Sequence, residues 1–143
     1  MTPQARAERS AAAMWAADRA SQGLGMTLTR IAPGAATFTL RVRDDMLNGH
    51  NLCHGGFIFA LADSAFAFAC NSYNQNAVAQ NNQITYVAPA SAGELLAATA
   101  TEIHRSDRSG IYDVTVTGDM NRTVALFRGH SRTIPGTHFE EPQ

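Results

Sequence analysis

Hydrophobic and polar positions alternate with different periods along the chain, and the period predicts the kind of element. Residues 4–22 are rich in alanine with scattered charges, which predicts an amphipathic helix within residues 1–22. Two short alternating runs then flank Pro33-Gly34, a pattern typical of a β-hairpin. The following stretch, residues 44–56, is polar and contains glycine, which predicts a loop.

A second helix is predicted over residues 56–72, where apolar residues lie on all sides, as in a buried helix. Residues 136–143 are expected to form a flexible tail. The runs with the character of strands are 77–89, 94–105, 110–119 and 123–134. This order predicts an α+β fold in which one curled antiparallel sheet wraps around the long central helix, as a single domain over residues 1–143.

Composition narrows the class of protein. Among the 143 residues, 45% are hydrophobic and 16% are charged, as in a well-packed globule, and the formal net charge of -1 gives no reason to expect nucleic acid or an anionic membrane as a partner. The chain has no apolar run long enough for a membrane span or a secretory signal. Cys53 and Cys70 are too few for a disulfide framework, so we expect free thiols and a cytoplasmic location. Exposed edges of the predicted sheet favour at least a dimer.

One carboxylate, Asp63, stands in the middle of the apolar helix. An acid in an apolar site is costly when charged, so it shifts its pKa, finds donors or faces water. One explanation is structural: Asp63 pairs with an arginine or caps a backbone group. The other is functional, because catalytic acids also occupy such places.

The loop before this helix favours the functional explanation. His54-Gly55-Gly56 stands where the loop enters the helix, and the first amides of a helix have no partner within it. A carbonyl oxygen docked on the Gly55 amide would be polarised, and an oxyanion formed there would be stabilised. Asp63 lies roughly 12 Å further along the helix axis, too far to act on the same carbonyl within one chain. A site shared across a two-fold interface removes this problem.

These residues carry a resemblance to a known family. Asn48-Gly49, His54-Gly55-Gly56 and Leu61-Ala62-Asp63-Ser64-Ala65-Phe66 together resemble the hotdog-fold acyl-CoA thioesterases, most closely those of phenylacetic acid degradation. Further similar stretches are Ala69-Cys70-Asn71-Ser72, Gly110-Ile111-Tyr112-Asp113 and the run from Thr123 to Gly129. Together they span most of the chain.

The resemblance implies a hotdog fold and homodimers or homotetramers whose active sites are built from two subunits. It assigns Asp63 as the catalytic carboxylate, either a general base on water or a nucleophile. Gly55 would offer its backbone amide to the thioester oxygen. Asn48 would orient water or substrate near the acid, and His54 would brace the loop or add a polar contact.

The substrate that the resemblance implies is an aryl-acyl-CoA, such as phenylacetyl-CoA or hydroxyphenylacetyl-CoA, with a role in phenylacetate degradation. A thiolate leaves readily, so one base and one oxyanion donor suffice. No cofactor or metal is expected, since coenzyme A is part of the substrate.

The sequence departs from some relatives where the CoA moiety would be held. Ala88 occupies a place where some relatives have an arginine, and residues 78–82 offer amides, among them Asn81, where some have a hydroxyl. Arg108 in the turn 105–109 and the following Gly110 are further candidates for substrate contacts.

Three alternatives remain open. Cys53 near His50 and His54 would suit a cysteine nucleophile. Asp45 and His50 have the spacing of hotdog enoyl-CoA hydratases, although the residues between them do not match that pattern. A non-catalytic acyl-CoA-binding hotdog domain is the third.

Overall fold

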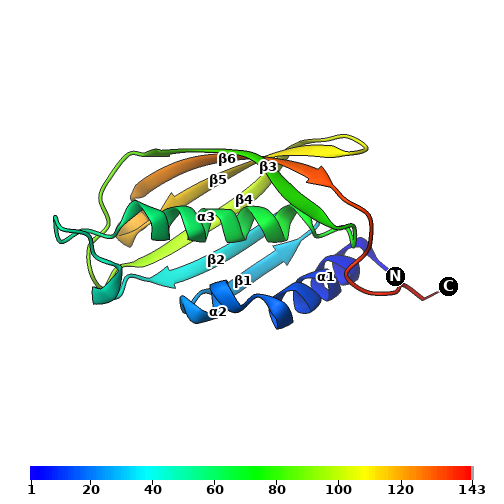
Figure 1. The fold of residues 1–143 in the computed structure, drawn as a ribbon, viewed down its shortest axis with the longest axis horizontal. Coiled ribbons are helices and arrows are strands. Elements are labelled where there is room, and N and C mark those ends of the chain that lie inside the picture. Colours follow the sequence, from blue (N-terminus) through cyan, green and yellow to red (C-terminus); the bar gives the residue numbers. More distant parts are fainter. Residues whose placement is uncertain (143) are drawn as a thin grey trace.

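Six antiparallel strands form one sheet, and a helix of sixteen residues lies across one of its faces (Figure 1). The computed structural model describes residues 1–142, so Gln143 of the expected tail lies outside the described residues. The helices are α1 (Pro3–Ala17), α2 (Arg19–Gly23) and α3 (Gly55–Cys70), with short 3-10 helices η1 (Asp44–Met46) and η2 (Asp119–Asn121). The strands are β1 (Thr27–Ala32), β2 (Ala35–Arg41), β3 (Ala77–Tyr86), β4 (Leu95–Arg105), β5 (Ser109–Thr117) and β6 (Thr123–Thr133).

Helix α3 is the centre of the core. Its apolar side chains pack against β2, β4 and β5, which confirms the predicted sheet around a buried helix. The contact is close at Gly129 of β6, where a Cβ atom would lie 2.6 Å from Cε2 of Phe66. Phe66 also packs against Tyr112 and Phe127, with ring centroids 5.7 and 5.8 Å apart. No helix within residues 1–142 has the length and apolar character needed to cross a membrane.

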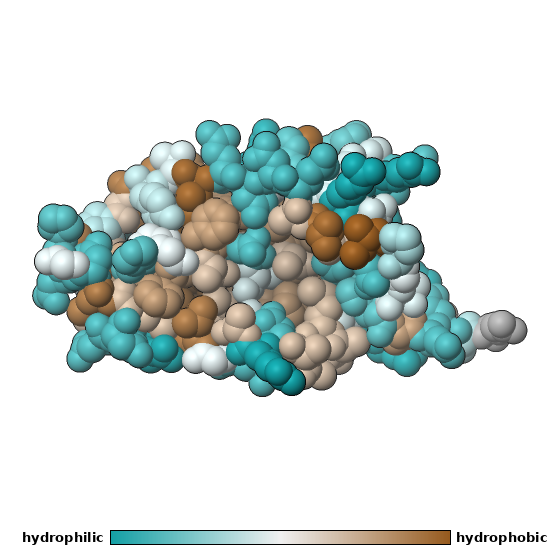
Figure 2. Space-filling view, viewed as in Figure 1, coloured by the Kyte–Doolittle hydropathy of each residue, from teal (hydrophilic) through white to brown (hydrophobic). Residues whose placement is uncertain are grey.

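One side of α3 is only half-buried in the single chain, although the sequence predicted burial on all sides. Asp63 and Phe59 lie on this side. Figure 2, seen from the same direction as Figure 1, shows apolar side chains gathered along the middle of the face that α3 occupies. This face is therefore less well covered than the opposite side of α3, which the sheet buries.

The sheet has the strand order β1-β2-β4-β5-β6-β3, so β1 and β3 are its edges. Along the β3 edge, Ala79 pairs with Ser131 and Asn81 pairs with His130, which leaves Gln80 as the extra residue of a β-bulge. Large apolar side chains are exposed on this part of the sheet: Val78, Tyr86, Val87 and Leu126. Exposed edges and apolar residues of this kind favour association with another chain.

The N-terminal segment is two helices rather than the one predicted. The break is at Asp18, whose carboxylate accepts hydrogen bonds from the backbone N–H (2.9 Å) and the hydroxyl (2.7 Å) of Ser21. An aspartate can satisfy the free amides at a helix start in this way, which stabilises a new helix there. Ser21 also lies 2.8 Å from the hydroxyl of Ser64, and this contact joins α2 to α3.

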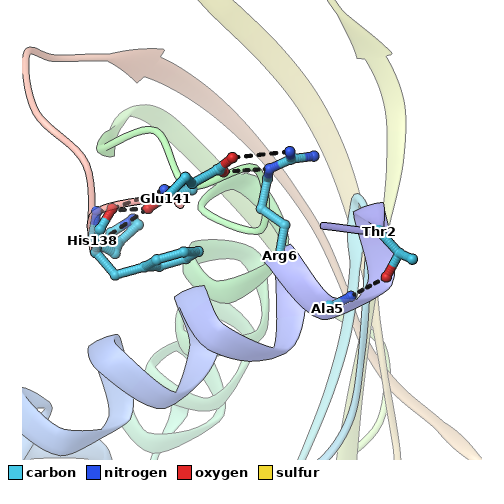
Figure 3. A network of polar contacts seen from close by, with 7 residues as sticks. Thr2, Ala5, Arg6, His138 and Glu141 are labelled. Atoms are coloured by element: carbon cyan, nitrogen blue, oxygen red, sulfur yellow. Dashed lines mark hydrogen bonds and ion pairs between the residues drawn. The ribbon is translucent and has the colours of Figure 1, made fainter. Parts of the chain in front are cut away.

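The segment after β6 makes specific contacts that the sequence pattern did not predict. Glu141 accepts hydrogen bonds from Nε and Nη2 of Arg6 on α1 (Figure 3). The guanidinium of Arg9 lies over the ring of Phe139, so this segment holds α1 at two places. His138 lies 2.9 Å from the side-chain oxygen of Asn71, which follows α3. Residues 136–142 thus connect α1 to the end of α3.

Candidate active site

The N-terminus of α3 leaves a backbone donor without a partner. His54 caps the helix: its Nδ1 accepts the Gly56 N–H at 2.9 Å, and its carbonyl accepts the Phe57 N–H at 3.0 Å. An Nδ1 that accepts a hydrogen bond belongs to an imidazole whose proton is on Nε2 when it is neutral. Within residues 1–142, no acceptor is found for the N–H of Gly55. This amide lies at the positive end of the helix dipole, where negative charge is stabilised.

Gly55 faces a pocket of about 390 Å³ between the start of α3 and the end of β3. Asn48 lines the same pocket, so the structure brings together two of the residues that the sequence singled out. The remaining lining is mostly apolar: Leu52, Cys53, Ile58, Tyr86, Val87, Ala88 and Pro89. The pocket therefore combines an apolar wall with a polar end at the helix N-terminus.

Tyr86 fixes the first turn of α3, a role that sequence reasoning missed. Its hydroxyl donates to the carbonyl of Gly55 at 2.9 Å. Its ring lies so close that a Cβ atom at position 55 would be 3.0 Å from the ring carbon Cζ. The contact joins residues far apart in the sequence, so no local pattern could have indicated it.

Asn48 holds the loop that shapes this pocket. The side-chain oxygen of Asn48 accepts the N–H groups of His50 (2.9 Å) and Leu52 (3.2 Å). An asparagine that bonds to the backbone two residues later fixes a tight turn. The oxygen of Asn48 is thus engaged with the loop backbone.

Asp63 is held by an amide on the edge strand. The Nδ2 of Asn82 donates to Oδ1 of Asp63 at 3.1 Å. Burial raises the pKa of Asp63 above its ordinary value, and the hydrogen bond from Asn82 opposes part of that rise. The Oδ1 of Asn82 is buried, and no hydrogen-bond partner is found for it among the described residues. The site thus holds a carboxylate that takes up protons more readily than an exposed one.

The pocket at Gly55 does not include Asp63 among its lining residues. Asp63 lies eight positions after Gly55 on α3, which corresponds to roughly 12 Å along the helix axis. One chain therefore carries two separate parts of a site: an amide donor with an apolar pocket, and a carboxylate with its amide partner.

The three candidates for substrate contacts lie elsewhere. Asn81 is exposed, while its neighbour Asn82 reaches Asp63. Asn81 and Gly110 line a polar pocket of about 470 Å³ at the start of β5, whereas Arg108 lines a separate pocket. Gly110 also has a packing role, since a Cβ atom there would lie 2.7 Å from the ring of Tyr112.

The geometry gives little support to Cys53 as a nucleophile, or to Asp45 and His50 as a hydratase pair. Burial, and to a smaller extent the charge of Glu94, raises the pKa of the Cys53 thiol, which disfavours the reactive thiolate. Asp45 is exposed and pairs with Arg43 at 3.0 Å, and no contact between Asp45 and His50 is found within residues 1–142. The described residues also contain no group of three or more His, Cys, Asp or Glu side chains placed to hold a metal ion.

Comparison with known proteins gives relatives along nearly the whole chain. Residues 50–125 match the Thioesterase superfamily. The acyl-coenzyme A thioesterase PaaI of Escherichia coli (strain K12) is 43% identical over 132 residues, which cover 92% of this chain and 94% of the relative.

Solved structures agree with this. The structure of the E. coli PaaI protein, from the phenylacetic acid degradation operon, superposes with a TM-score of 0.93 and 42% identity over 95% of this chain and 99% of that one. A Streptococcus mutans protein bound to acetyl-CoA superposes with a TM-score of 0.76 and 25% identity, over 79% of this chain and 91% of that one. The predicted hotdog fold is confirmed, and the chain belongs to the thioesterase superfamily and is a thioester hydrolase.

Proposed function

We propose that this protein hydrolyses acyl-CoA thioesters, with aryl-acyl groups such as phenylacetyl or hydroxyphenylacetyl as the substrates, at active sites shared by two copies of the chain. The observation that carries the proposal is the unpartnered N–H of Gly55 at the mouth of an apolar pocket. Such a donor suits a carbonyl oxygen that becomes negative during attack. Similarity to an acyl-CoA thioesterase and to a structure bound to acetyl-CoA supports the CoA substrate.

The chemistry needs two protein groups. The Gly55 amide polarises the thioester carbonyl, and ionised Asp63 takes a proton from water as the water oxygen bonds to the carbonyl carbon. The carbon–sulfur bond then breaks and the CoA thiolate leaves as a stable anion. Direct attack by the Asp63 carboxylate, followed by hydrolysis of the anhydride, uses the same two groups. Both routes require Asp63 to be deprotonated, and neither requires a cofactor.

Two surfaces support a dimer, which itself could pair into a tetramer. The β3 edge has free backbone groups and exposed apolar side chains, with Val78 46% and Tyr86 48% exposed. The half-buried side of α3 lies next to this edge, since Asp63 of α3 contacts Asn82 of β3. Pairing two β3 strands extends the sheet and covers this side of α3.

One pairing register joins the two parts of the site. On β3, Asn82 lies beside Asp63 and Tyr86 lies beside Gly55, because each donates a hydrogen bond to that residue of α3. If Asn82 of one chain lies opposite Tyr86 of the other, Asp63 faces Gly55 of the partner subunit. In an antiparallel pair centred on Ile84, this condition holds at both sites at once. The two-fold symmetry therefore gives two equivalent active sites per dimer.

The aryl preference rests on the pocket and on the relatives. A flat apolar ring suits the side chains of Leu52, Ile58 and Val87 that line the Gly55 pocket. The E. coli relative comes from a phenylacetic acid degradation operon, which supports a role of this chain in phenylacetate degradation.

Replacing Asp63 by Asn should lower thiol release from phenylacetyl-CoA by about 10²–10⁴-fold, because the base or nucleophile is lost. The measurement is thiol release from aryl, short-chain and long-chain acyl-CoAs by the wild type and the variant. The melting temperature of the variant at pH 7 should equal or exceed that of the wild type, because it no longer buries a charge. Full activity of the variant contradicts the catalytic role, and activity confined to long aliphatic chains contradicts the aryl preference.

The pH dependence of the hydrolysis rate should follow the protonation of Asp63. The rate falls as the pH drops through the raised pKa of Asp63, since the protonated acid cannot act. Asn82→Ala removes a hydrogen bond that favours the charged form, so the acid side of the pH–rate profile should move to higher pH. Gln83→Ala, which removes an exposed amide next to Asn82 on the same strand, is the matched control. An unchanged acid side in Asn82→Ala argues against Asp63 as the titrating group.

Two substitutions at Gly55 distinguish the effect of losing the backbone N–H from the effect of crowding by an added side chain. Gly55→Pro removes the N–H, and proline is well tolerated at the first position of a helix. His54 already has the extended backbone (φ -61°, ψ 133°) that precedes proline. Gly55→Ala keeps the N–H and adds only the Cβ that meets Tyr86. We expect kcat to fall about 10²–10³-fold further in Gly55→Pro than in Gly55→Ala, and equal losses would show that crowding alone is responsible.

Mixing two inactive variants tests whether the site is shared. A dimer of one Asp63→Asn chain and one Gly55→Pro chain has one site with both defects and one site with neither. When the two variants are co-expressed with different tags, random pairing should restore about a quarter of the wild-type activity. This activity should be found in the dimers that carry both tags. If each chain holds a complete site of its own, every site keeps a defect and no activity returns.

A further inference from the structure

Most arginines of this chain already have a partner in the structure. Ion pairs, backbone hydrogen bonds or stacking on aromatic rings engage seven of the 11 basic residues: Arg6, Arg9, Arg41, Arg43, Arg105, Arg122 and Arg128. Within residues 1–142, no such partner is found for the others, which are Arg19, Arg30, Arg108 and Arg132. Two of these four, Arg108 and Arg132, line one pocket.

The backbone holds these two arginines side by side. Arg108 belongs to the turn between β4 and β5, and Arg132 lies on β6 opposite Ser109. The N–H of Thr133 donates to the carbonyl of Arg108 at 2.9 Å, which joins the turn to β6. The pocket they line has a volume of about 470 Å³. Asp107 also lines it, but among the described residues no ion pair joins Asp107 to either arginine, and the two guanidinium groups outnumber the one carboxylate.

Paired guanidinium groups are suited to phosphate. Each presents a planar fork of N–H donors that matches two phosphate oxygens. The neighbouring polar pocket, which shares the same turn, adds the hydroxyls of Ser106 and Ser109 and the imidazole of His130. Together the two pockets offer arginine for phosphate and neutral polar groups for the rest of a nucleotide.

The distance from the carboxylate to these arginines lies within the reach of a CoA molecule. Asn82, beside Asp63, lies opposite Gly129, and Val78 lies opposite Arg132. Three residues of β6 separate Gly129 from Arg132, about 10 Å along the strand, and the bulge at Gln80 takes up the additional residue on β3. About thirteen bonds join the thioester sulfur of CoA to its first phosphorus, equivalent to roughly 15 Å of extended chain. The arm of a CoA thioester bound at Asp63 is therefore long enough for its phosphates to reach Arg132.

The proposed dimer leaves an open path between Asp63 and Arg132. With the pair centred on Ile84, β3 of the partner ends opposite Asn82, so residues 77–81 have no strand beside them. This open edge, which includes the bulge at Gln80, joins the side of the sheet that holds Asp63 to the side that holds Arg132.

We propose that Arg108 and Arg132 bind the phosphates of the CoA portion of the substrate. The inference rests on the proposed function, because a thioester substrate of CoA is what brings phosphates to this surface. In Arg108→Gln/Arg132→Gln, KM for phenylacetyl-CoA should rise by about tenfold or more with kcat nearly unchanged. For phenylacetyl-pantetheine, which lacks the nucleotide, kcat/KM should equal that of the wild type. The matched control is Arg19→Gln/Arg30→Gln, which removes two other arginines without a partner.

Phenylacetyl-dephospho-CoA separates the two kinds of phosphate. This substrate lacks the 3′-phosphate. If the wild type hydrolyses it with the same KM as phenylacetyl-CoA, the arginines bind the diphosphate. If its KM is higher, they bind the 3′-phosphate. Equal losses on the CoA and pantetheine substrates, or no change on phenylacetyl-CoA, overturn the proposal.

Calorimetric titration with adenosine 3′,5′-bisphosphate tests the anion site without turnover. It should bind the wild type and the control variant but not Arg108→Gln/Arg132→Gln, and equal binding to all three overturns the proposal. A wild type that binds the bisphosphate but hydrolyses no acyl-CoA would contradict the proposed function alone.

Discussion

The burial of α3 is the constraint on which the rest of the structure depends. Its apolar side chains point in every direction, and a single sheet can cover only part of a helix. The sheet curls around one side, where Phe66 packs onto the backbone of Gly129. The other side, with Phe59 and Asp63, is half-covered in one chain. Two of the features proposed to carry function, the carboxylate of Asp63 and the free edge of β3, lie on that side.

The active-site parts follow from ordinary features of helix structure. A helix N-terminus has amides without partners, and here His54 takes those of Gly56 and Phe57. Tyr86 then holds the first carbonyl from the opposite strand. The donor at Gly55 is therefore fixed before any substrate arrives, and a fixed donor costs no rearrangement when negative charge develops.

Much of the fold was predictable because it depends on local periodicity. The strand runs and the apolar helix appear close to their predicted bounds, and the motif around Gly55 and Asp63 indicated the family. The break at Asp18 was not predicted, because a side-chain cap on Ser21 decides it rather than hydrophobic spacing. The sequence also could not indicate which of the two amides, Asn81 or Asn82, contacts Asp63. The bulge at Gln80 adds a residue to the edge strand, so simple alternation does not give the side on which each amide lies.

The contact between Gly129 and Phe66 has a consequence for the history of this protein. A side chain at position 129 has no room unless the ring at position 66 becomes smaller, and a smaller ring leaves a void against β6 unless position 129 fills it. Either change alone carries a penalty that the second change relieves. The two positions are therefore expected to evolve as a pair, and the order in which their substitutions arise is restricted even though both residues lie away from the reacting atoms.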